Sequence, residues 1–178
     1  MSPPDQNASN ASSAMGISFD RLAEAIREGM SFLSDKQLPS GEFVTLLGAD
    51  HSLQGGVFDS SPFVTAHILQ ALHGVQHPGI GEVIRKALDY LRSEKELGGV
   101  WRYYSRRQWK HCRIPPDLDD TACASHALRL YGEAVPRNEW IFRSCRNEKG
   151  LFRTWIASHD RKGFFHRLGW LRLLGDWI

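Results

Sequence analysis

The fold of this chain is decided by a short turn, Gln37-Leu38-Pro39-Ser40-Gly41-Glu42-Phe43, and by its return as Leu97-Gly98-Gly99-Val100-Trp101. The glycine two positions before the aromatic residue, and the aromatic residue itself, each recur after 58 positions. An amphipathic stretch precedes each turn, and glycine tolerates the left-handed conformation in which helices commonly end. A pattern that recurs at one spacing predicts a chain of repeated helical units.

Apolar residues at helical spacing predict where the helices lie. Two amphipathic helices are expected on the outside of the fold, near Phe19–Ser34 and Gly81–Ser93. Two helices rich in small apolar residues are expected on the inside, near Pro62–His73 and Asp119–Tyr131, and a weaker helix near Glu139–Arg146. Serine, aspartate and proline residues mark the starts of the inner helices. The predicted fold class is therefore all-α, built from α/α helical hairpins.

The repeat also predicts how the chain is organised. The spacing of 58 aligns Asp59 with Asp117 and Ser61 with Asp119, and a third, shorter copy of the turn ends in Phe152. The start of the chain is rich in Ser, Asn and Pro and is expected to be disordered. The predicted divisions are a tail at 1–16, a repeat domain at 17–158 with units at 19–76, 77–134 and 135–158, and an aromatic, basic segment at 159–178.

Composition narrows the class of protein. The chain has 178 residues, 42% of them hydrophobic, and a net charge of only +2, so the overall charge favours no nucleic-acid partner. Its three cysteines form no CxxC pair, which favours reduced thiols in a cytoplasmic protein. No apolar run approaches the roughly 20 residues that a membrane span needs. The stretch 101–113 holds five basic residues and no acidic one, which suits phosphate, diphosphate or an anionic membrane, or simply a solvated turn.

One acidic motif carries a resemblance. Asp117-Leu118-Asp119-Asp120-Thr121-Ala122 resembles the Asp-x-Asp-Asp-Thr-Ala signature of class II terpene cyclases, such as squalene–hopene cyclase. The turn at 37–43 resembles the Gln/Trp repeat motif of the same superfamily, which includes the prenyltransferases. The glutamine of this motif occurs in the first unit only, as Gln37; the later units have Lys95 and Arg146 at that position. The resemblance covers roughly 19–152 and implies a partial, open α/α-toroid.

The resemblance also implies an activity, namely cyclisation of a polyprenyl substrate that begins with protonation. Asp119 would be the general acid, tuned by Asp117 and Asp120, and His126 on the same helix is a candidate partner. One carboxyl group among several can stay protonated because like charges resist joint ionisation. Aromatic rings would stabilise the cations that form. The candidate substrate contacts are Trp101, Tyr104 and Trp109, with Tyr103 beside them. No metal or cofactor is expected.

Other interpretations remain open. Acidic residues in the first turn of a helix stabilise its dipole, so Asp117 and Asp119 would also suit simple capping roles. The Asp-x-Cys pair that binds zinc in protein prenyltransferases does not occur here, and the Cys-His pair of lanthipeptide cyclases is reversed, as His111-Cys112. The alternative function is a non-catalytic α/α-repeat interaction module, or an inactive remnant of a cyclase.

Partners follow from the number of repeats. A complete toroid takes about six helix pairs, and this chain supplies two and part of a third. We therefore expect no closed active site in a lone monomer, and self-association or a partner domain that completes the ring. The segment 159–178 would cover the open inner face or mediate that association, with peripheral membrane contact as a further expectation. The expected substrate is an isoprenoid, and no nucleic-acid partner is expected.

Overall fold

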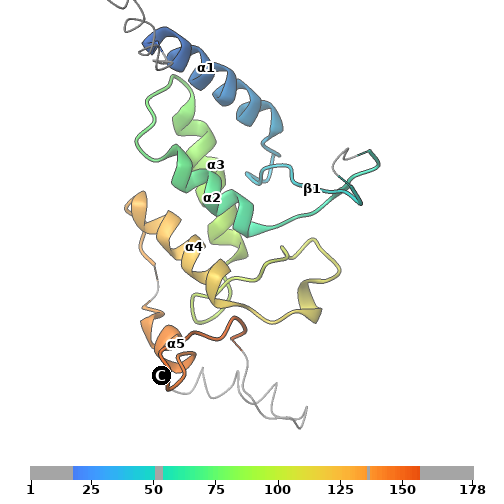
Figure 1. Ribbon diagram of the computed structural model, residues 1–178, viewed down its shortest axis with the longest axis vertical. Coiled ribbons are helices and arrows are strands. Elements are labelled where there is room, and N and C mark those ends of the chain that lie inside the picture. The colour runs from blue at the N-terminus through green and yellow to red at the C-terminus, as the bar shows by residue number, and fades with distance from the viewer. Residues whose placement is uncertain (1–17, 51–53, 136, 157–178) are drawn as a thin grey trace, which may run out of the picture. The chain divides into compact units, whose positions relative to one another are not determined.

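The computed structural model describes residues 18–50, 54–135 and 137–156 (Figure 1). The predicted tail at 1–16 and the segment at 159–178 lie outside these residues. The prediction of an all-α fold is confirmed, and each predicted helix is present within a few residues of its expected bounds. The helices are α1 (Phe19–Lys36), α2 (Pro62–Leu72), α3 (Ile80–Glu94), α4 (Leu118–Leu130) and α5 (Glu139–Ser144), with a short 3-10 helix at His111–Arg113.

The chain divides into two compact units, with the boundary between Asp35 and Lys36. The first unit contains almost all of α1, an amphipathic helix with large apolar side chains that are exposed, among them Phe19 and Leu22. The second unit contains all the other elements. No helix in the described part of the chain is long and apolar enough to cross a membrane.

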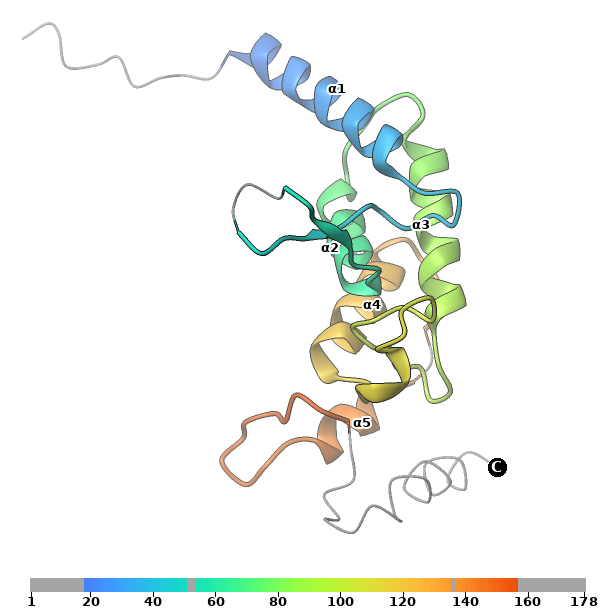
Figure 2. The ribbon, with the colours of Figure 1, turned by 90° about the vertical axis from the view of Figure 1, so that its right-hand side faces the viewer.

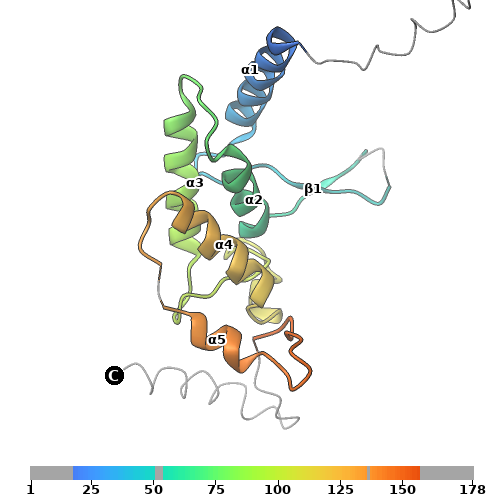
Figure 3. The ribbon, with the colours of Figure 1, turned by 60° about the vertical axis from the view of Figure 1, so that its left-hand side comes forward.

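The core of the second unit lies where α2 packs against both α3 and α4 (Figures 1 and 3). Buried side chains follow helical spacing in α2, where Ala66 and Leu69 are fully buried. Leu91 of α3 and Leu128 of α4 are also buried. Burying one such leucine side chain contributes roughly 2 kcal/mol, so this apolar contact is the main stabilising term of the unit.

The turn after α1 is pressed against α3. Gly41 has a positive φ of 91°, and a Cβ atom placed on it would come within 1.9 Å of the Lys86 carbonyl oxygen. The Gln37 amide Nε2 donates to the Gly41 carbonyl at 3.1 Å and to the Val83 carbonyl at 2.8 Å. A side chain at position 41 would therefore have to displace backbone.

The third sequence repeat closes its own turn with an arginine. The Arg146 Nε donates to the Gly150 carbonyl at 3.3 Å, four residues ahead, as Gln37 does to Gly41. In the third repeat, Arg146 therefore makes the same contact to a glycine carbonyl that Gln37 makes in the first repeat. Backbone bonds tie this repeat to the start of α4, where Leu118 N–H donates to Thr154 O at 2.8 Å. Beneath them lies a small apolar core made of Val100, Leu118, Ile141, Cys145 and Ile156.

The inner helices repeat at a spacing of 56 residues, which corrects the predicted spacing of 58. Ser61 is the N-cap of α2 and Asp117 is the N-cap of α4. The aromatic turns do keep their spacing of 58. The prediction that Asp59 corresponds to Asp117 was wrong because the segment between the aromatic turn and the inner helix is two residues shorter in the second sequence repeat than in the first. Asp117, and not Asp119, is therefore the counterpart of Ser61.

A small β-hairpin was not predicted. β1 (Leu46–Leu47) pairs antiparallel with β2 (Val57–Phe58), with Leu47 opposite Val57. The hairpin extends away from the helices of the second unit (Figures 2 and 3). All four residues are exposed, so the hairpin adds no core.

Candidate functional site

The acidic motif lies at the N-terminus of α4. Asp117 is the helix N-cap, and its Oδ1 accepts the Asp120 backbone N–H at 2.8 Å. Its side chain is buried, which raises the pKa of Asp117, while its hydrogen bonds with Asp120 act in the opposite direction. The capping interpretation therefore accounts for the position of Asp117.

Asp120 holds the proton of the motif. Its side chain is only 2% exposed, and its Oδ1 atom has no hydrogen-bond partner among the described residues. Burial raises the pKa of Asp120 to about 9, with further contributions from its hydrogen bond to Asp117 and from the charges of Asp117 and Asp119. The Asp120 carboxyl group is consequently neutral at pH 7.

Asp119 differs from both neighbours because it is exposed, although it lies in the same helical turn. His126, predicted as a possible partner of the acid, is also exposed and stands two turns further along α4. Proton storage and solvent access therefore fall on two different carboxyl groups of the motif. One carboxyl group, Asp120, stays protonated, and another, Asp119, faces solvent.

Aromatic rings from two elements lie near the buried carboxyl. The Tyr103 hydroxyl donates to Asp59 Oδ2 at 3.3 Å, and its pKa is raised by burial and by the charges of Asp59 and Asp120. Its ring lies edge-on to Tyr104 at 4.9 Å between centroids and 6.3 Å from the ring of Phe63 on α2. Phe63 was not predicted, because an apolar residue in a helix is ordinarily interpreted as core.

A cysteine–histidine pair lies beside the same surface. Cys123 Sγ of α4 is 3.6 Å from His67 Nε2 of α2. Burial and the nearby charges of Asp120 and Asp119 raise the pKa of Cys123, so the thiol stays protonated. The two residues are 56 positions apart, so the repeat, at its correct spacing, places them side by side. In the described parts of the chain no group of three or more metal-ligating side chains exists.

The predicted substrate contacts fall in three different environments. Trp101 is fully buried, and its indole N–H donates to the Leu91 carbonyl at 2.9 Å, so the structure gives it a place in the core. Tyr104 is half-buried and lies next to Tyr103. Trp109 is 63% exposed, with the Arg113 guanidinium 4.6 Å from its ring centroid. Of these three, only Tyr104 thus joins the aromatic group around Tyr103.

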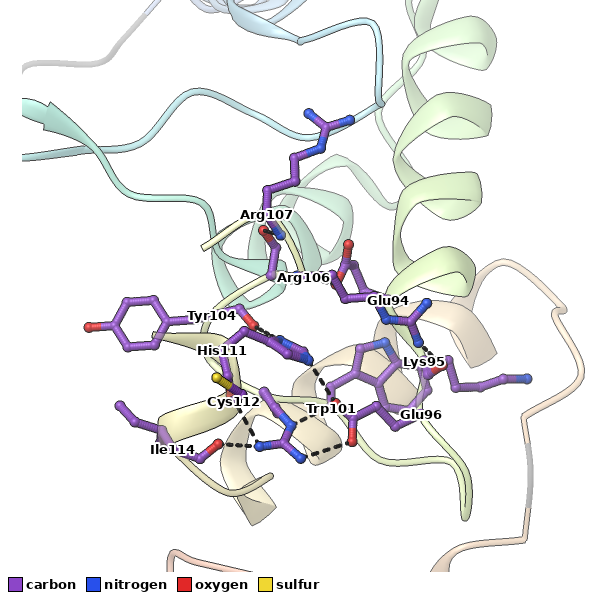
Figure 4. A network of polar contacts seen from close by, with 12 residues as sticks. Glu94, Lys95, Glu96, Trp101, Tyr104, Arg106, Arg107, His111, Cys112 and Ile114 are labelled. Atoms are coloured by element: carbon purple, nitrogen blue, oxygen red, sulfur yellow. Dashed lines mark hydrogen bonds and ion pairs between the residues drawn. The ribbon is translucent and has the colours of Figure 1, made fainter. Parts of the chain in front are cut away.

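A polar network fixes the basic loop that carries these rings. Figure 4 shows His111 between Tyr104 and Glu96, with Nδ1 2.8 Å from the Tyr104 carbonyl and Nε2 3.2 Å from Glu96 Oε1. The Arg102 Nε donates to the same Glu96 oxygen at 2.6 Å. Arg106 contacts the end of α3, where its backbone N–H donates to Glu94 Oε2 at 2.9 Å. Part of the basic stretch is therefore structural.

Known sequences that are similar to this chain come from one family model and from two curated proteins. The sequence model of the A-macroglobulin TED domain family matches residues 11–107. Bifunctional levopimaradiene synthase of Ginkgo biloba is 32% identical over 87 residues, 47% of this chain and 9% of that protein. Its counterpart in Picea sitchensis is 31% identical over 97 residues, 52% of this chain and 10% of that protein. The chain spans about a tenth of the length of these curated relatives.

A solved structure of a protein from Actinoplanes is similar in fold. The two share a TM-score of 0.56 and 25% sequence identity, over 75% of this chain and 36% of that one. The similarity to levopimaradiene synthase supports a terpene-cyclase-like α/α fold, as the resemblance of the acidic motif implied. The family match ends at Arg107, ten residues before Asp117, and it covers more than half of the chain. The chain therefore belongs to the A-macroglobulin TED domain family.

Proposed function

We propose that this chain carries a class II terpene-cyclase-like acid site, which starts the cyclisation of a polyprenyl substrate by protonation. The substrate class is an isoprenoid, either squalene-like or a prenyl diphosphate. One observation carries the proposal, namely the buried and neutral Asp120 carboxyl within an Asp-x-Asp-Asp run at a helix start. The partial similarity to levopimaradiene synthases supports the same chemistry.

The proposed step needs a proton at an alkene. The π electrons of the alkene form a C–H bond with the acidic proton, which leaves a carbocation on the substrate and a carboxylate on the protein. Asp120 holds the proton at neutral pH, and exposed Asp119 in the same turn is the group that delivers it. Delivery leaves a carboxylate on Asp119, the Asp120 proton then moves to it, and solvent water supplies the proton that restores Asp120 before the next turnover. Asp117 caps the helix and accepts a hydrogen bond from Asp120.

The rings near the motif suit the cation that forms. Tyr103, Tyr104 and Phe63 present π faces or edges within one small group. A π face attracts a positive charge by roughly 0.5 to 2 kcal/mol. A raised pKa keeps the proton in place but does not make the acid strong, so this stabilisation of the product cation is part of the proposal.

Product formation tests the site. The full chain is incubated with squalene and, separately, with geranylgeranyl diphosphate, and products are identified by mass spectrometry. We expect Asp120→Asn and Asp119→Asn each to lower product formation by about a hundredfold or more, the usual contribution of a general acid. Asp89→Asn, an exposed carboxyl of α3, is the matched control and should retain activity. Absence of cyclised product from the unaltered chain contradicts the proposal.

The second candidate function is a non-catalytic α/α-repeat interaction module. It is favoured by the capping bond of Asp117 and by the family match, which ends before the acidic motif. In this case a partner domain or a second copy would complete the ring. Light scattering at several concentrations distinguishes the two candidates together with the product assay, because a module associates without forming product.

A further inference from the structure

We propose that the β1–β2 hairpin and the basic loop 101–114 form one surface that binds the interface of an anionic lipid bilayer. This inference is independent of the acid chemistry at α4. We call this surface the hairpin–loop face. It is made of Leu46, Leu47, Val57, Phe58, Arg107, Trp109, Lys110 and Arg113.

The hairpin supplies the apolar part. Both residues of each strand are exposed, with Val57 at 67% and Leu47 at 55%. In a hairpin that covers a core one side of each strand would be buried, but here neither side is. Adjacent large apolar side chains on an exposed ribbon mark an interaction site more often than a solvated surface.

The loop supplies the charge and an aromatic anchor. Arg102 is engaged in its ion pair with Glu96, and the Arg106 guanidinium donates to the Lys95 carbonyl at 2.9 Å. Two of the remaining cations flank Trp109, which is 63% exposed: the Lys110 ammonium lies 5.8 Å and the Arg113 guanidinium 4.6 Å from its ring centroid. Tryptophan with flanking Lys and Arg is the combination found at membrane–water interfaces, where the ring lies among headgroups and the cations meet phosphates.

The two parts are joined. The Gln108 side-chain Nε2 donates to the Phe58 carbonyl at 3.2 Å, which ties the loop to the second strand of the hairpin. Both belong to the second compact unit of the chain, and Figure 2 shows both on the side that faces the viewer. Apolar side chains and cations therefore lie next to each other on one surface.

The combination of cations and apolar side chains favours an anionic bilayer over a nucleic acid as the binding partner. A nucleic acid would pair with the cations but would leave the hairpin in water. An anionic bilayer interface takes both, because the apolar side chains enter the headgroup region while Lys and Arg meet phosphate and carboxylate groups. Asp50 lies past β1 in the hairpin loop and its charge opposes binding, so the loop cations have to outweigh it.

Vesicle flotation of the full chain tests the inference. We expect the chain to float with vesicles that contain phosphatidylserine and to stay below vesicles of phosphatidylcholine alone. Leu47→Ser combined with Val57→Ser should lower binding by about tenfold or more, since both apolar side chains are lost. Arg107→Gln combined with Arg113→Gln should lower it by about 25-fold, at about fivefold per charge near an anionic surface.

Matched double variants away from the face serve as controls. Leu151→Ser with Phe152→Ser removes two apolar side chains that are 62% and 59% exposed, and Arg143→Gln with Lys149→Gln removes two exposed cations. Neither should change flotation, and circular dichroism should show an unchanged helix content in all four. The inference is overturned if the unaltered chain does not float, or if control pairs lower binding equally. It is also overturned if the hairpin pair abolishes only self-association, because the face then binds a second copy.

Discussion

The N-termini of α2 and α4 solve the same structural problem with different carboxyl groups. At α2 the carboxyl comes from the preceding turn, where buried Glu42 Oε1 accepts the Ser61 N–H at 2.9 Å, the Ser60 hydroxyl at 2.5 Å and the Tyr90 hydroxyl at 3.0 Å. At α4 the position of Glu42 in the turn is taken by apolar Val100, and the helix supplies its own carboxyl groups, Asp117 and Asp120.

The two buried carboxyl groups, Glu42 at α2 and Asp120 at α4, differ in how many hydrogen-bond donors they contact. Glu42 receives three hydrogen bonds on one oxygen, which makes it a structural acceptor. Glu42 Oε2 and Asp120 Oδ1 both have no hydrogen-bond partner among the described residues, but Asp120 has carboxyl neighbours and its pKa is raised to about 9. Both repeats therefore bury a carboxyl group at the start of the inner helix, and in the second repeat that group, Asp120, stays protonated at pH 7. The proposed protonation of the substrate depends on the raised pKa of Asp120, to which its carboxyl neighbours contribute.

The pH dependence of stability gives the largest expected effect. The pKa of Asp120 rises from an ordinary carboxyl value in the unfolded chain to about 9 in the folded one, so the folded chain holds an extra proton between these values. The stabilisation is full below about pH 4 and is lost as pH rises towards 9, by up to about 1.4 kcal/mol per pH unit. Asp120→Asn should flatten this slope, measured by urea denaturation from pH 5 to 9. A slope that survives in Asp120→Asn, or disappears in Asp119→Asn, contradicts the assignment.

Removing the acceptor at α2 should have the next largest effect. Glu42→Leu leaves the Ser60, Ser61 and Tyr90 donors without their common partner, and each unsatisfied buried donor costs about 1 kcal/mol or more. We expect a loss of about 3 kcal/mol in the free energy of unfolding, at about 1 kcal/mol for each donor. Glu42→Gln keeps an acceptor oxygen in place and should lose less than half as much. Equal losses for both variants would contradict the role of Glu42 as a hydrogen-bond acceptor.

The two N-caps should respond alike to loss of the cap. Ser61→Ala and Asp117→Ala should each cost about 1 kcal/mol of stability, the usual value for a lost N-cap side chain. Asp117→Ser places the first unit's cap in the second unit and should retain stability in thermal denaturation. If the same variant also forms product at the normal rate, Asp117 acts as a cap alone.

The smallest effect is expected at the threonines that hold the turns. Thr121 Oγ1 accepts the Trp101 N–H at 3.1 Å and donates to the Asp117 carbonyl at 2.6 Å. Thr65 Oγ1 accepts the Phe43 N–H at 3.4 Å. Thr121→Val should cost about 1 kcal/mol and Thr65→Val about half of that, because the bond at Thr65 is longer. The reverse order in chemical denaturation would contradict the geometry of the two turns.

Periodicity predicted the helices because each apolar stripe is long and ends at a glycine, a cap or a proline. It did not predict the burial of Glu42, since a charged residue in a turn is ordinarily exposed and only distant partners such as Tyr90 make it an acceptor. The hairpin was missed because strands of two residues, Leu46–Leu47 and Val57–Phe58, are too short for an alternating pattern.

The site was predicted as a motif but not residue by residue. Neighbouring residues on a helix point about 100° apart, so the phase of α4 decides whether Asp119 or Asp120 is buried. A repeat spacing that is wrong by two residues changes that phase, and it aligned Asp119, and not Asp117, with the cap residue Ser61. The same error hid the His67–Cys123 pair.

The close approach at Gly41 has a mechanical consequence. The turn lies directly against the Lys86 carbonyl at Gly41, and Gln37 donates a hydrogen bond to the Val83 carbonyl, so a movement of α3 acts on the turn through both contacts. The next residue is Glu42, which is bonded to the backbone at the start of α2. A displacement of α3 would therefore be passed through Gly41 and Glu42 to the cap of the neighbouring helix, so the three elements are mechanically linked.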